Sequence, residues 1–228
     1  MSELCELLLW LVMCQDVDMS VSRFGAMVAI GAVVIASMGG ASAVAEPGAA
    51  PRTTDNRPIV VIGASISTGY EVAGVVAYPR MISAIERRSV YLSARGGAGY
   101  ADGSIAGLTQ AARLTEHDPA LVVVQAGSND VGASPAAIDA QVRQVITTVQ
   151  RQAPNAKVAL ITVFPSVRGS GPDARATEAA IVGAARAVAP SVSVISPLSE
   201  GWVYGSSSDG HPDAATHQKL AERVAALA

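Results

Sequence analysis

Charged side chains are scarce in this sequence. Asp, Glu, Lys and Arg make up 15% of its 228 residues, against roughly 25% in an average soluble domain. Residues 1–45 hold only one of the 16 Lys and Arg residues and four of the 19 Asp and Glu residues, so 15 charges of each sign remain after them. No basic run or patch is left to bind a phosphate backbone, and nucleic acid is therefore excluded as an expected partner.

Cysteine and aromatic residues are also few. Both cysteines, Cys5 and Cys14, lie near the N-terminus, so a chain starting at Glu46 has no disulfide and no cysteine for lipid attachment. His, Cys and Asp nowhere show the spacing of metal ligands, and neither a metal nor another cofactor is expected. An aromatic content of 4% argues against a broad aromatic platform for sugars. The aromatic residues that we consider for the border of a cleft are Tyr70, Tyr100, Trp202 and Tyr204, the last two fitting loop packing equally well.

The longest apolar run lies near the N-terminus. It extends from Phe24 to Met38, follows Arg23 and leads into the small residues of Ala41–Ala45. This order of basic, apolar and small segments is typical of a secretory signal peptide. The alternative is a membrane anchor, because residues 24–45 are long enough to span about 30 Å as a helix. The small residues favour cleavage, so we expect a secreted or cell-envelope protein that meets a membrane only through this segment.

The residues around this segment set the expected domain boundaries. Residues 1–18 are acidic and apolar, unlike the start of a signal peptide, and we hypothesise that translation begins at Met19. Residues 46–58 contain three prolines and no apolar periodicity, which predicts a linker. Residues 59–228 then form a single domain, which we expect to be monomeric.

Apolar runs and helical patterns alternate along the domain. Ile138, Val142, Val145 and Val149 recur on one face of a helix that starts at Ser134-Pro135 and ends at Gln152. Further helices are predicted from Ala174 to Val188 and from near Pro212, the latter burying Leu220, Val224 and Leu227. The predicted strands are Ile59–Ile62, Val90–Leu92, Leu121–Val124, Val158–Val163 and Val192–Ile195. This alternation predicts an α/β protein with a parallel five-stranded sheet covered on both faces.

Four loops at the carboxyl edge of that sheet carry groups suited to acyl transfer. Gly63-Ala-Ser-Ile-Ser-Thr-Gly69 offers a serine, Ala94-Arg-Gly-Gly-Ala-Gly-Tyr100 glycine N–H groups, and Gln125-Ala-Gly-Ser-Asn-Asp130 an amide and a carboxylate. Ser208-Asp-Gly-His-Pro212 adds an imidazole beside an acid. A hydroxyl needs a base to become a nucleophile, and the developing oxyanion needs fixed donors. Each segment alone also fits an ordinary turn, so the conjunction carries the prediction.

The chain has three histidines, which differ in their positions relative to the predicted strands and helices. His117 precedes a predicted strand and so belongs at the opposite edge of the sheet. His217 lies one turn inside the last helix, spaced with Leu220 and Val224, as a packed or hydrogen-bonded side chain would be. His211 is therefore the candidate base.

In this order the four segments resemble the blocks of the SGNH (GDSL) hydrolases, which are secreted or periplasmic esterases and lipases. The resemblance covers the chain from Pro58 to the C-terminus and implies a three-layer α/β/α flavodoxin-like sandwich. It also implies Ser65 as the nucleophile and His211 as the base. The implied oxyanion donors are the N–H of Ser65, the N–H of Gly99, with Gly97 as a close alternative, and the side chain of Asn129.

Two positions depart from the pattern of the family. The residue before the nucleophile is Ala64 instead of the usual Asp, so a carboxylate cannot hold this loop. The common last block, Asp-x-x-His, would place the acid at Ser208, whereas the acid here is Asp209. Asp209-Gly-His-Pro212 resembles the last block of the family-two carbohydrate esterases, in which a backbone carbonyl can orient the histidine. Asp209 is thus the candidate orienting residue, with a backbone carbonyl as the alternative.

The expected function is that of a secreted serine esterase that hydrolyses carboxylic esters through a covalent acyl-enzyme. The substrate would be an ester of a small molecule, a glycan or a lipid. The alternatives are a catalytically silent protein of the same fold that binds glycan or lipid, and an acyltransferase whose acceptor is a sugar.

Overall fold

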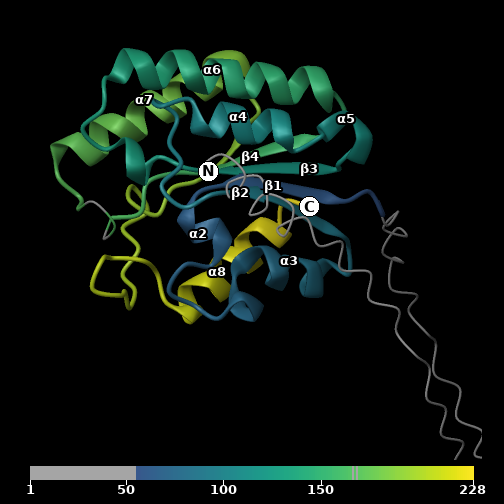
Figure 1. Ribbon diagram of the computed structural model, residues 1–228, viewed down its shortest axis with the longest axis horizontal. Helices are drawn as coiled ribbons and strands as arrows, with labels where there is room; N and C mark the ends of the chain where they lie inside the picture. The colour runs from purple at the N-terminus through teal and green to yellow at the C-terminus, as the bar shows by residue number, and fades with distance from the viewer. Residues whose placement is uncertain (1–54, 166, 168) are drawn as a thin grey trace, which may run out of the picture. The chain divides into compact units, whose positions relative to one another are not determined.

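The computed structural model describes residues 55–165, 167 and 169–228. The predicted signal segment and residues 46–54 of the predicted linker lie outside this range. Within it, five strands form one parallel sheet in the order β2-β1-β3-β4-β5 (Figure 1). The strands are β1 (Ile59–Gly63), β2 (Val90–Ala94), β3 (Leu121–Gln125), β4 (Lys157–Ile161) and β5 (Ser193–Ile195). The predicted fold class is confirmed.

Helices cover both faces of the sheet (Figure 1). One face is covered by α4 (Ser104–Ala111), α5 (Leu114–His117), α6 (Pro135–Gln152) and α7 (Pro172–Val188). The other is covered by α2 (Ser65–Thr68), α3 (Tyr78–Glu86) and α8 (Ala214–Ala225). Two short 3₁₀ turns, Gly74–Val76 and Ser128–Asp130, complete the elements.

The continuous apolar strands supply two separate cores. In β1, Val60 and Ile62 pack on the side of α4, α6 and α7, whereas Ile59 and Val61 pack on the side of α3 and α8. Successive side chains of a strand point to opposite faces, so in a strand covered on both sides every position faces an apolar core. This is why β1 and β3 read as unbroken apolar runs.

Helix α6 has the predicted bounds, whereas α7 begins at Pro172, two positions before the predicted Ala174. Pro135 occupies the first turn of α6, but the preceding Ser134 side chain makes no capping hydrogen bond. The last helix begins at Ala214 because Asp213 caps it, its carboxylate accepting the N–H of Thr216 at 2.9 Å. Leu220 and Val224 are fully buried, and Leu227 is only partly buried after the end of α8.

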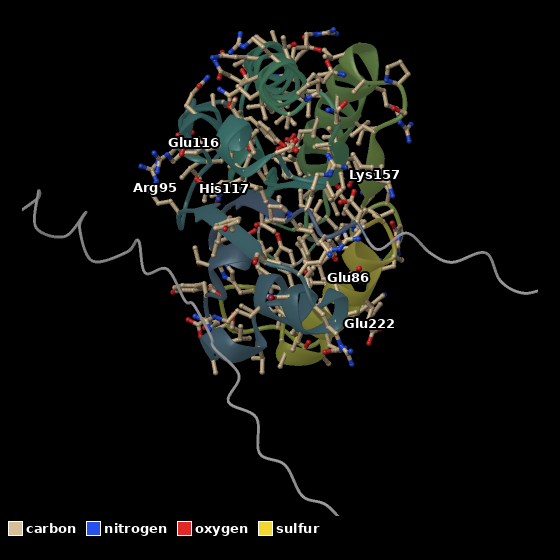
Figure 2. The ribbon with its side chains drawn as sticks, turned by 90° about the vertical axis from the view of Figure 1, so that its right-hand side faces the viewer. Glu86, Arg95, Glu116, His117, Lys157 and Glu222 are labelled. Atoms are coloured by element: carbon tan, nitrogen blue, oxygen red, sulfur yellow. The ribbon has the colours of Figure 1, made fainter. Side chains whose placement is uncertain are left out.

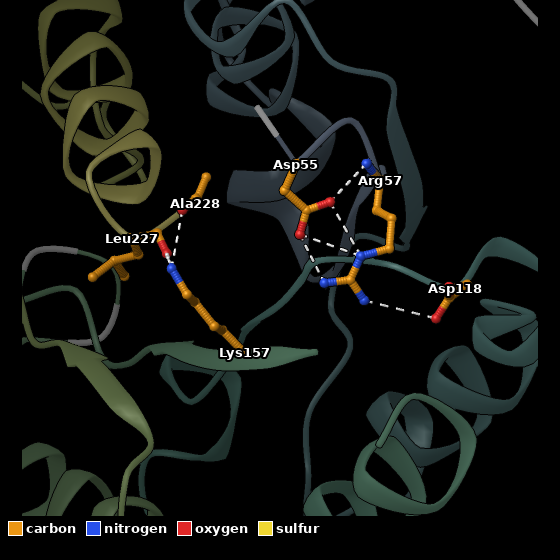
Figure 3. Close-up of polar contacts among 6 residues, drawn as sticks. All are labelled: Asp55, Arg57, Asp118, Lys157, Leu227 and Ala228. Atoms are coloured by element: carbon orange, nitrogen blue, oxygen red, sulfur yellow. Dashed lines mark hydrogen bonds and ion pairs between the residues drawn. The ribbon is translucent and has the colours of Figure 1, made fainter. Parts of the chain in front are cut away.

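The side of the domain from which the strands start carries several charged side chains, among them Glu86, Glu116 and Lys157 (Figure 2). Here the Arg57 guanidinium donates to both carboxylate oxygens of Asp55 and lies 3.8 Å from the Asp118 carboxylate (Figure 3). The Lys157 ammonium donates to the carbonyl oxygens of Leu227 and Ala228 at 3.1 and 3.0 Å. Both ends of the described chain are thus held at the edge opposite to the carboxyl ends of the strands. None of the described helices is long and apolar enough to cross a membrane.

Candidate active site

The four loops singled out in the sequence meet at the carboxyl edge of the sheet. Three of them leave β1, β2 and β3, which are adjacent and parallel, so their ends coincide. The fourth precedes α8. At this edge the Ser65 hydroxyl lies 2.7 Å from Nε2 of His211, although 146 positions separate them in sequence. Such a distance allows direct proton transfer between a hydroxyl and an imidazole.

The imidazole of His211 is held by a carboxylate on its other side. Nδ1 of His211 lies 2.9 Å from Oδ1 of Asp209, and the same oxygen accepts the backbone N–H of His211 at 3.3 Å. The Ser207 hydroxyl also donates to Asp209. The hydrogen bond from Ser207, together with that from His211, lowers the pKa of Asp209 to about 2. An ionised Asp209 keeps the proton on Nδ1, which leaves Nε2 free to accept from Ser65.

A tight turn explains how an acid only two positions from the histidine can reach its ring. Gly210 has a positive φ of 88°, a conformation that glycine adopts without strain. The Ser207 N–H donates to the carbonyl of His211 at 2.9 Å and closes the turn. Asp209 is therefore folded back onto the imidazole, and neither Ser208 nor a backbone carbonyl occupies that place.

Tyr70 covers the imidazole from the direction of α2. The two ring centroids lie 4.6 Å apart at an angle of 56°, and Tyr70 is 49% exposed. The charges of Glu71 and Asp209 raise the pKa of Tyr70, so its phenol stays neutral. The sequence suggested Tyr70 as a cleft residue, but it gave no sign that Tyr70 would contact the base.

The candidate oxyanion donors lie in three of the loops. Ser65 is the first residue of α2, and its N–H makes no hydrogen bond with any residue that the structure describes. The first N–H groups of a helix have no partner within the helix and remain available. The Asn129 side chain donates one amide hydrogen to the carbonyl of Ala98 at 2.9 Å and retains a second. Asn129 thus joins its loop to the glycine loop.

The two candidate glycines differ in their surroundings. Gly97 has a φ of 77° and open space where a side chain would be, whereas a Cβ on Gly99 would lie 2.7 Å from Oδ1 of Asp130. The same oxygen accepts the N–H of Ala101 at 2.8 Å. Only Gly99 is therefore pressed against the Asn129-Asp130 segment.

The Gly99 N–H also lies near a carboxylate. Burial raises the pKa of Asp102, but hydrogen bonds from Ser104 and the Gly99 N–H outweigh it, and the pKa is lowered.

The remaining serine and histidines of interest are structural. Ser67, the second serine of the Gly63–Gly69 segment, is fully buried with its hydroxyl bonded to Tyr78 and Gln125. His117 stacks on Tyr91 with ring centroids 3.7 Å apart. His217 is buried, and its Nδ1 accepts the N–H of Tyr78 at 3.2 Å. Among the described residues, no group of His, Cys, Asp and Glu has the arrangement of a metal site.

Sequence reasoning missed Gln125, the last residue of β3. It is 1% exposed, and its side-chain oxygen accepts the N–H groups of Ala64 and Ser67, both at 3.2 Å. The available signal was a polar residue closing the apolar run Leu121–Val124 directly before the Gly127-Ser-Asn-Asp130 segment.

Comparisons with known proteins show the family and the fold of this chain. The profile of the GDSL-like Lipase/Acylhydrolase family matches residues 61–224. Among curated proteins, none matches the sequence. A solved structure of TesA is similar with 27% identity and a TM-score of 0.58, the match covering 73% of this chain and 95% of that one.

Two carbohydrate esterases share the fold at lower identity. A family-two carbohydrate esterase from Clostridium thermocellum, solved with cellohexaose, has 20% identity and a TM-score of 0.60, with 75% of this chain covered. The acetyl xylan esterase Est2A from Butyrivibrio proteoclasticus has 14% identity and a TM-score of 0.55, also with 75% covered. The chain spans 63% of the length of each of these two proteins.

Proposed function

The chain belongs to the GDSL-like lipase/acylhydrolase (SGNH) family, whose profile covers residues 61–224, and on this premise we propose that it is a serine esterase that works through an acyl-enzyme. The observation that carries the proposal is the continuous contact Ser65–His211–Asp209, with distances of 2.7 and 2.9 Å. A nucleophile, a base and an orienting carboxylate in hydrogen-bond contact are the geometric signature of this chemistry.

In the proposed reaction, the Ser65 oxygen attacks the ester carbonyl carbon while Nε2 of His211 takes the hydroxyl proton. The negative charge on the former carbonyl oxygen is stabilised by the N–H of Ser65, the N–H of Gly99 and the free amide hydrogen of Asn129. When the intermediate collapses, the carbon–oxygen bond to the alcohol breaks and His211 returns the proton to the departing alkoxide. Water then attacks the acyl-enzyme, giving its proton to His211, which passes it back to Ser65 as the carboxylic acid leaves.

For the substrate, we propose an ester carried by a carbohydrate. The support is the fold shared with the Clostridium thermocellum carbohydrate esterase and Est2A, together with the Asp-x-His-Pro form of the last block. Acetylated xylan and acetylated cello-oligosaccharides are the substrates to try first, and adding free cello-oligosaccharide to the assay separates hydrolysis from transfer to a sugar.

We also propose that the protein is exported and cleaved after Ala45. The support is the order of Arg23, the apolar run of residues 24–38 and the small residues of Ala41–Ala45. Sequencing the N-terminus of the protein recovered from the producing cells should give Glu46 as the first residue. A recovered protein that still carries residues 24–45 would contradict cleavage.

The esterase proposal is tested by hydrolysis of nitrophenyl acetate and longer nitrophenyl esters. Ser65→Ala should lower kcat by about 10⁶-fold, the scale seen when the nucleophile of a serine hydrolase is removed. Ser83→Ala is the matched control, because it removes a hydroxyl of α3 that donates to the backbone carbonyl of Arg88. Equal turnover by wild type and Ser65→Ala would refute the proposal. A wild-type protein that hydrolyses none of these esters and also leaves acetylated xylan intact would favour a silent glycan-binding protein.

A further inference from the structure

The loop that carries the nucleophile has to be fixed without the carboxylate that usually precedes the serine in this family. The loop turns sharply from β1 into α2, so that Ala64 is the last residue before the helix and Ser65 the first one in it. A methyl side chain at position 64 makes no hydrogen bond. Some other group must therefore hold the Ser65 hydroxyl in line with His211.

Gln125 makes the contacts that are needed. Its side-chain oxygen accepts three hydrogen bonds from the loop, namely the Ala64 and Ser67 N–H groups at 3.2 Å and the Ser67 hydroxyl at 3.0 Å. Its backbone carbonyl accepts the Ala64 N–H as well, at 3.1 Å. One buried residue of β3 thus forms hydrogen bonds with the loop on both sides of Ser65.

Ser67 and Tyr78 extend this contact to helix α3. The Ser67 hydroxyl donates to Gln125, so it accepts from the Tyr78 hydroxyl, 2.7 Å away. Tyr78 is fully buried, and burial raises its pKa, so it remains a neutral donor. Gly63 makes room for this arrangement, because a Cβ there would lie only 2.1 Å from the Ser67 hydroxyl oxygen.

We propose that Gln125 is a positioning residue of this enzyme, which through the chain Tyr78–Ser67–Gln125 fixes the nucleophile loop in place of the missing carboxylate. The proposal rests on the esterase function proposed above. Removing this acceptor takes one hydrogen bond from each of three donors, so that the Ala64 and Ser67 N–H groups keep only the backbone carbonyls of Gln125 and Ala64, at 3.1 and 3.0 Å. The loop would then shift, and displacement of a reacting group by 1 Å can cost about 100-fold in rate.

The test uses Gln125→Met, which has a similar length but no acceptor, and Gln125→Glu, which restores one. We expect Gln125→Met to lower kcat and the rate of fluorophosphonate labelling of Ser65 by 10- to 100-fold, with KM within about twofold of wild type. Gln125→Glu should recover most of that loss, because a carboxylate oxygen accepts the same three bonds. In Gln125→Met, the pH at which activity is half-maximal should equal that of wild type, since His211 and Asp209 are unchanged.

Two further variants separate positioning from general stability. Thr109→Val removes an equally buried hydroxyl, bonded to the carbonyl of Ile105 on α4, and should keep the wild-type labelling rate at a comparable loss of Tm. Tyr78→Phe removes only the outermost hydroxyl of the chain and should slow labelling less than Gln125→Met does. If Gln125→Met does not fold, the test rests on Tyr78→Phe. A folded Tyr78→Phe variant that is labelled at the wild-type rate would then overturn the proposal.

The outcomes also distinguish this proposal from the one on which it rests. A wild-type protein that reacts with neither esters nor the fluorophosphonate removes the esterase function and the positioning role together. A reactive wild type with a Gln125→Met variant that labels as fast as Thr109→Val overturns only the positioning role.

Discussion

The protonation of His217 should make the stability of the domain depend on pH. This side chain is fully buried in α8, and Tyr78 donates its N–H to Nδ1, so the ring proton lies on Nε2. Nε2 has no hydrogen-bond partner among the residues that the structure describes. Burial lowers the pKa of His217 to about 4, with the nearby Asp213 opposing the shift and His211 adding to it.

The sign and size of the effect follow from this value. An unfolded chain takes up the proton near pH 6.5, whereas the folded one resists it until about pH 4. The stabilisation is therefore complete above pH 6.5 and is lost as the pH falls from about 6.5 to 4. Each unit of difference is worth about 1.4 kcal/mol, which makes the loss about 3 kcal/mol in the free energy of unfolding.

Urea unfolding between pH 7.5 and pH 4 measures this loss. His217→Gln is the comparison, because its amide oxygen can accept the Tyr78 N–H and does not titrate. We expect the free energy of unfolding of wild type to fall by about 3 kcal/mol more than that of His217→Gln across this range. Parallel curves for the two proteins would refute the reasoning.

Three further predictions concern the active site. Asn129→Ala should lower kcat by about 100- to 1000-fold, the cost of one oxyanion donor, and far-ultraviolet circular dichroism should show an unchanged fold. Asp209→Asn should lower kcat by about 10⁴-fold because the amide favours the wrong imidazole tautomer; a loss below tenfold in steady-state kinetics would contradict this role. Gly99→Ala should cost more kcat than Gly97→Ala, because only the first places a methyl group against Asp130, and a smaller loss in Gly99→Ala would contradict this reasoning.

Most of the fold could be predicted because periodicity and burial agree in this chain. The run Ile59–Ile62 has no polar residue, which only a strand covered on both faces requires, and the structure buries all four side chains. Boundaries were less certain. The fourth strand was predicted to end at Val163 but ends at Ile161, and Thr162 and Val163 already belong to the following loop. Apolar residues beyond a strand are buried too, so hydrophobicity alone does not show where the ladder stops.

The candidate site was predictable only in part. Ser65 and His211 follow from the order of the loops, since parallel strands bring their carboxyl ends together. The contact of Asp209 with His211 depends on the positive φ of Gly210, and the contact of Tyr70 with the imidazole depends on how α2 is placed. Gln125 contacts Ala64 from 61 positions away. Such tertiary contacts leave little trace in a single sequence, because a polar residue at the end of a strand fits many structures.

The central claim is that Ser65 is the residue that becomes acylated, and mapping a covalent adduct tests it most directly. The protein is treated with a fluorophosphonate, digested, and the modified residue identified by mass spectrometry. Ser67 is a built-in comparison only two positions away, with a hydroxyl that is fully buried and bonded to Tyr78 and Gln125. We predict a single adduct on Ser65 that disappears in His211→Asn. An adduct on Ser67, or none on an intact and folded protein, would contradict the account.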